Sequence, residues 1–132
     1  MAKWTDQGET DVGNIYLKNQ TQNSYLYLGL YTNTSEPAES ATLSDITEPS
    51  GGNYSRKQLD PSNWTESPQG TFSQPEQTFT ASGADWGNVY GYFLATSSDN
   101  TGKLIAVEHF SDGPYNIKDG HSVKITPKIT IS

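Results

Sequence analysis

The sequence contains no cysteine, so it can form neither disulfides nor thiolate metal sites. Small secreted domains often depend on disulfides, and their absence favours synthesis in a reducing cytoplasm. No apolar stretch has the length of a signal peptide before Tyr25, and none reaches the ~20 residues that span a bilayer. We therefore expect no membrane association.

Positive charge and apolar residues are also scarce. The chain has eight Lys and Arg residues against fifteen Asp and Glu residues, which gives a net charge of −7. Because affinity for nucleic acids depends on neutralising phosphates, direct binding of DNA or RNA is not expected. Only 32% of the residues are apolar, but three Trp, eight Tyr and four Phe lie mostly in short alternating runs. Such an aromatic content indicates a folded domain with a thin core.

Motifs for catalysis and metal binding are missing. Glu108 and His109 are neighbours in an expected strand, so their side chains leave opposite faces. A hydrolase would need two carboxylates about 5–10 Å apart. The candidate pairs for such a hydrolase are Asp45 with Glu48 and Asp112 with Asp119. Acids in Ser, Pro and Gly loops usually form turns, so we predict no enzyme, no catalytic residue, no cofactor and no metal.

Apolar and polar residues alternate in many short runs, which is typical of strands. No segment shows the three- and four-residue apolar spacing of a helix. About eight runs are separated by turn signals, including a hairpin turn at residues 99–102 and a strand interrupted at Pro75. The pattern predicts an all-β fold, a two-sheet β-sandwich or jelly roll that covers residues 15–132. The expected core residues are Leu26, Leu28, Leu30, Val123, Ile125 and Ile129, with Ile131 on the same face.

Residues 1–14 are expected to form an N-terminal arm. The segment is polar, and Gly8 and Gly13 favour an irregular chain. Polar termini stay disordered unless another element holds them. We therefore predict that a partner chain holds this arm, with Trp4 as the anchor.

The loop of residues 32–53 is longer than most passive connections. Leu43 and Ile46 are its only large apolar side chains, and they either plug a pocket on a neighbour or fold back over the sheet edge. Tyr25, Tyr27 and Tyr31 lie on the face opposite the leucines, where they either cover a thin core or form an exposed patch. Trp64 and Trp86 stand beside turns, where a core anchor and a sugar-stacking platform look alike. The predicted interface residues are Trp4, Leu43, Ile46, Tyr25, Tyr27 and Tyr31.

Four stretches resemble small structural proteins of tailed bacteriophages. They are LGLYTN at residues 28–33, LSDITEPSGGNYSR at 43–56, VYGYF at 89–93, and residues 120–132. The resemblance implies a virion protein, specifically a head decoration or cement protein on the capsid surface. The expected partners are the major capsid protein and further copies of the chain in a homotrimer. A tail- or fibre-associated adhesin module that binds carbohydrate through exposed aromatics is the alternative, and a small hydrolase is a third possibility.

Overall fold

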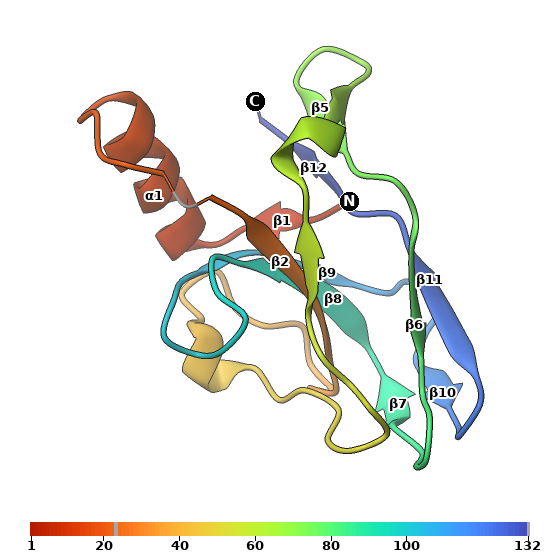
Figure 1. The fold of residues 1–132 in the computed structure, drawn as a ribbon. Coiled ribbons are helices and arrows are strands. Elements are labelled where there is room, and N and C mark those ends of the chain that lie inside the picture. Colours follow the sequence, from red (N-terminus) through yellow and green to blue (C-terminus); the bar gives the residue numbers. More distant parts are fainter. Residues whose placement is uncertain (23, 132) are drawn as a thin grey trace.

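The computed structural model describes residues 1–22 and 24–131, and it is built mostly of short antiparallel strands (Figure 1). Its centre is a five-stranded sheet with the order β1-β9-β8-β2-β3. These strands are β1 (Lys3–Trp4), β9 (Leu104–His109), β8 (Gly91–Ala95), β2 (Leu26–Tyr31) and β3 (Lys57–Leu59). The turn at residues 99–102 connects β8 to β9, as the sequence predicts.

Three smaller sheets complete the β structure. In one of them β5 (Thr71–Ser73) lies between β12 (Lys128–Thr130) and β4 (Thr65–Glu66). The other two pair β11 (Ser122–Ile125) with β6 (Gln77–Thr80), and β10 (Tyr115–Ile117) with β7 (Gly87–Val89). The turns η1 (Leu43–Asp45) and η2 (Pro61–Asn63) lie in the loops. Buried side chains from the central sheet and from the smaller sheets share a core, which we call the first core. The predicted all-β, sandwich-like fold is therefore confirmed, with one helix added.

The first core lies between the central sheet and the smaller sheets. Leu28 and Leu30 are buried on its central-sheet side, as expected from their alternation in the sequence. Val123, Ile125 and Ile129 are buried on the opposite side, and Leu26 is half-buried. The prediction fails for Ile131, which is 53% exposed because β12 ends at Thr130.

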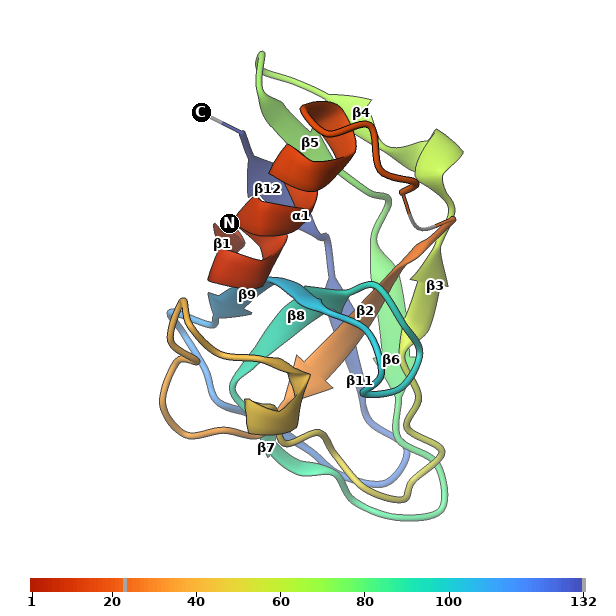
Figure 2. The same cartoon turned by 90° about the vertical axis from the view of Figure 1, so that its left-hand side faces the viewer.

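The other face of the central sheet is covered by the loop of residues 32–53, which lies in front of the sheet in Figure 2. Leu43 and Ile46 are buried there against Phe93 and Val107. A capping box between Thr42 and Asp45 shapes η1 so that its apolar side chains point inward. The prediction that Leu43 and Ile46 plug a neighbour is therefore wrong, and the alternative that they fold back over the sheet is the observed one.

The segment predicted as an arm instead forms β1 and the helix α1 (Asp6–Tyr16), both of which pack on β9. Thr5 caps the helix, since its hydroxyl accepts a hydrogen bond from the amide of Gly8 at 3.0 Å. A side chain at Gly8 would collide with the backbone carbonyl of Ile105. The glycine that argued against regular structure therefore permits close packing of the helix on the sheet.

Candidate functional site

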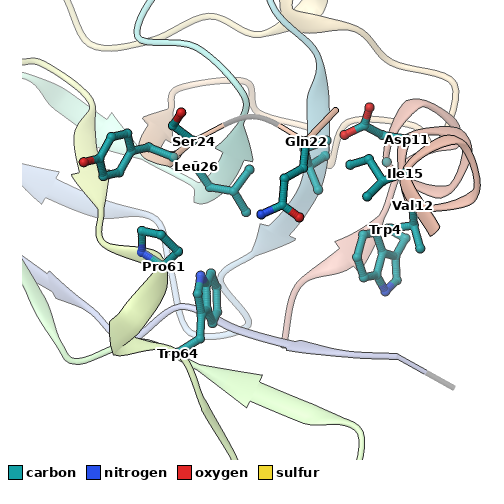
Figure 3. Close-up of a pocket in the computed structure, with 12 residues that line it drawn as sticks. Trp4, Asp11, Val12, Ile15, Gln22, Ser24, Leu26, Pro61 and Trp64 are labelled. Atoms are coloured by element: carbon teal, nitrogen blue, oxygen red, sulfur yellow. The ribbon is translucent and has the colours of Figure 1, made fainter. Parts of the chain in front are cut away.

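A groove opens between α1, the start of β2 and the turn η2. Its cavity measures about 260 Å³. Figure 3 shows Trp4, Val12 and Ile15 on one side, with Pro61 and Trp64 on the opposite side. We call this site the aromatic groove, and its main apolar lining residues are Trp4, Val12, Ile15, Leu26, Trp64 and Ile105.

A second hollow of about 290 Å³ shares Trp4, Leu26, Trp64 and Ile105 with the groove. It is lined by apolar side chains alone and reaches Ile131 at the end of β12. Concave, mostly apolar surfaces of this kind are typical of binding sites. The groove and the hollow together make one apolar depression beside α1.

Hydrogen bonds hold the Trp4 indole and the turn that precedes Trp64 in place. The Trp4 Nε1 group donates to the Thr130 carbonyl at 2.8 Å, which fixes the ring against β12. Trp64 follows η2, where Asp60 accepts a hydrogen bond from the Ser62 amide at 2.9 Å. This carboxylate also accepts from the Ser62 hydroxyl, and both bonds lower the pKa of Asp60. The Trp4 ring is thus set before any ligand binds.

The rim of the groove is acidic on the side of α1, where Asp11 lines the groove and Glu9 lines an adjoining hollow. The helix carries Asp6, Glu9 and Asp11 and no basic residue. Asp11 is paired with Lys103 at 2.6 Å. Glu9 is exposed and makes no ion pair among the described residues, so its charge is free to meet a basic partner.

An apolar knob, formed by Tyr16 and Leu17, projects at the C-terminal end of α1. Their side chains are 84% and 81% exposed, the largest values for big apolar residues in the described chain. The backbone amide of Leu17 donates to the Gly13 carbonyl at 2.8 Å, and that of Lys18 donates to it at 3.3 Å. Scattered surface apolar residues are ordinary, but an adjacent, fixed pair of this exposure is typical of a contact site. Sequence reasoning missed it because no helix was expected there.

The predicted interface residues divide into two groups. Trp4 and Tyr25 line the aromatic groove, and Tyr27 is half-buried on β2. Tyr31 is buried with Leu43 and Ile46. Its hydroxyl lies 2.8 Å from His109 Nδ1, and burial raises the pKa of Tyr31 well above its ordinary value.

The two tryptophans considered as sugar platforms also differ. Trp86 is buried, and its Nε1 group donates to the Gly52 carbonyl at 3.1 Å, so it is a core anchor. Trp64 is half-buried and lines the groove. Only Trp64 therefore remains a candidate for stacking on a ligand.

The acids considered for catalysis have structural partners. Glu48 binds Arg56 and Tyr54, and Asp45 caps η1. Asp119 accepts from the Gly83 amide at 2.8 Å, and Asp112 accepts from the Tyr115 hydroxyl. Across residues 1–22 and 24–131 no three His, Asp or Glu side chains are grouped as metal ligands. In the same residues, no helix has the length and apolar character needed to cross a membrane.

The β scaffold of this chain thus carries an apolar depression and an exposed knob. A family model described as "Podophage GP4 fiber I protein gp80" matches residues 3–130. Because the match covers nearly the whole chain, the chain belongs to this family and is a structural component of a phage virion. A search of curated proteins gave no match. The predicted resemblance to tailed-phage virion proteins is confirmed, whereas the family description names a fibre protein and not a capsid decoration protein.

Proposed function

We propose that this chain is a non-enzymatic module of the phage fibre that works by binding other virion proteins. The family match over residues 3–130 supports the fibre assignment and is the observation that carries it. The structural hydrogen bonds of the candidate catalytic acids support the non-enzymatic part. The apolar depression and the knob supply surfaces for protein contacts.

The position of the chain in the particle tests this proposal directly. Gold-labelled antibodies against the chain, imaged on intact virions by electron microscopy, should mark the fibres. Label over the head shell would contradict the fibre proposal and favour a decoration protein bound to the major capsid protein. A virion that lacks the chain supplies the control for label specificity.

Carbohydrate binding in the aromatic groove is the second candidate function. The half-buried Trp64 ring favours it as a surface on which a sugar can stack. Gln22 and Ser24 line the same groove and offer an amide and a hydroxyl for hydrogen bonds to the sugar. The acidic rim would disfavour anionic glycans and leave neutral ones. A glycan array should then show binding by the wild-type chain that Trp64→Ala removes. An array without any bound glycan would exclude this candidate and leave the fibre proposal intact.

A further inference from the structure

We propose that the aromatic groove of one copy binds the apolar knob of a second copy, so that copies of this chain assemble head to tail. The inference rests on the proposed fibre function and names the partner for its groove. Tyr16 and Leu17 would enter the groove, and Lys18 would lie at its acidic rim. The two surfaces differ, so each copy can use its knob on one neighbour and its groove on another.

The apolar surfaces match each other in chemistry. The knob presents two large side chains that occupy no cavity of their own chain, since both are more than 80% exposed. The groove offers about 260 Å³ with indole walls, and the adjoining hollow is lined by apolar side chains alone. Aromatic anchors that fill a desolvated pocket dominate the affinity of most protein interfaces.

The charges match as well. Lys18 follows the knob directly and makes no ion pair among the described residues. Asp11 lines the groove, and Glu9 lines an adjoining hollow that shares Trp4 and Val12 with it. Both acids lie on a helix that carries three acids and no base. A knob that is followed by a base therefore meets a groove rim of opposite charge. This complementarity favours the knob of a second copy as the occupant of the groove over an acidic partner.

Both surfaces are also fixed in advance. Hydrogen bonds to the Gly13 carbonyl hold the knob backbone, and the Trp4 indole is tied to β12. Binding then orders few additional groups, which reduces its entropic cost. Head-to-tail contacts close into rings when the rotation between copies permits, and the homotrimer expected from the sequence is one such ring.

Analytical ultracentrifugation of the full chain tests the contact. We expect concentration-dependent association with a Kd below ~1 mM. A Kd of ~1 mM corresponds to a binding free energy of about −4 kcal/mol. The knob variant Tyr16→Gln/Leu17→Gln and the groove variant Val12→Gln/Ile131→Gln should each weaken it at least about tenfold. All four side chains are exposed, so both variants should keep the wild-type melting temperature. Thr78→Gln, on the exposed face of β6, is the matched control and should associate like the wild type.

A mixing experiment distinguishes this contact from any other dimer. The knob variant keeps its groove and the groove variant keeps its knob, so an equal mixture should form heterodimers that neither variant forms alone. Lys18→Glu should likewise weaken association and recover it when mixed with Glu9→Lys. A wild-type chain that stays monomeric to ~1 mM, or a mixture that does not associate, would overturn the inference.

Two further results would also overturn it. If a neutral sugar shifts the Trp64 indole resonance while association is unaffected by both variants, the groove is a carbohydrate site. If association survives all substitutions, the contact lies elsewhere. Neither result alters where gold label marks the virion, so this inference and the fibre function fail separately.

Discussion

Replacement of Arg56 by Met should destabilise the chain more than loss of any exposed ion pair. The Arg56 side chain is 2% exposed, and its guanidinium group lies over the Phe93 ring at 5.0 Å. It binds both carboxylate oxygens of Glu48 at 3.0 and 2.9 Å. It also donates to the Ser97 carbonyl at 2.9 Å and to the Asp99 carbonyl. One side chain thus ties the long loop to β3 and to the β8–β9 turn.

The expected magnitude follows from what stays behind. Arg56→Met keeps the apolar stem but leaves the Glu48 carboxylate, which is only 22% exposed, without its counter-charge. Loss of one partner of a buried ion pair costs about 3–5 kcal/mol. Lys3→Met removes the pair with Glu36, in which both side chains are exposed, and should cost about 0–1 kcal/mol. Arg56→Met/Glu48→Gln should recover part of the loss, because no unpaired charge remains.

Urea denaturation measures these differences. With a slope of ~2 kcal/mol per molar urea, Arg56→Met should lower the midpoint by about 2 M and Lys3→Met by at most about 0.5 M. Equal midpoints for the two single variants would refute the role of Arg56 as a buried tie. A double variant less stable than Arg56→Met would contradict the argument about the unpaired Glu48 charge.

Three other changes test the packing. Leu43→Asp/Ile46→Asp should reduce the free energy of unfolding by several kcal/mol (about 2–5 per core side chain), which a lower melting temperature would report. Gly8→Ala should cost about 1–3 kcal/mol in urea, since the helix must lift from β9. Burial raises the pKa of Tyr31 and Tyr92, so above about pH 10 the unfolded state loses protons that the folded state keeps. Stability should therefore fall above pH 10 by up to about 1.4 kcal/mol per pH unit for each tyrosine, and a flat profile in denaturation series at pH 9–11 would contradict this.

Alternation was enough to predict β2 and β11 and most of the first core, but not β1 or β4. Leu28 and Leu30 on β2, and Val123 and Ile125 on β11, occupy the buried face that period two assigns to them. These strands have one face on the first core, so their sequences carry a clear signal. β8 is buried on both faces, and its position followed from its apolar run and from the hairpin turn.

The helix could not be recognised from apolar spacing. α1 contacts β9 through a glycine, and its acids and exposed apolar residues give no continuous apolar stripe. Thr5 and the acids that follow it were the available signal, since a Thr cap before an acidic first turn is typical of helix starts. Burial of Leu43 and Ile46 was equally hidden, because the sequence does not say which face of a sheet a long loop will cover.

The N-terminal segment joins the fold and the proposed assembly. β1 pairs with β9, α1 packs on the same strand, and the Gln7 side chain accepts a hydrogen bond from the Leu104 amide at 2.9 Å. The same segment supplies Trp4 and Val12 to the groove and carries the knob at its end. Deletion of residues 2–13 would therefore strip β9 of its cover while it removes one wall of the groove. Substitution of the exposed knob leaves β9 covered, so the knob variants and not a deletion can separate assembly from folding.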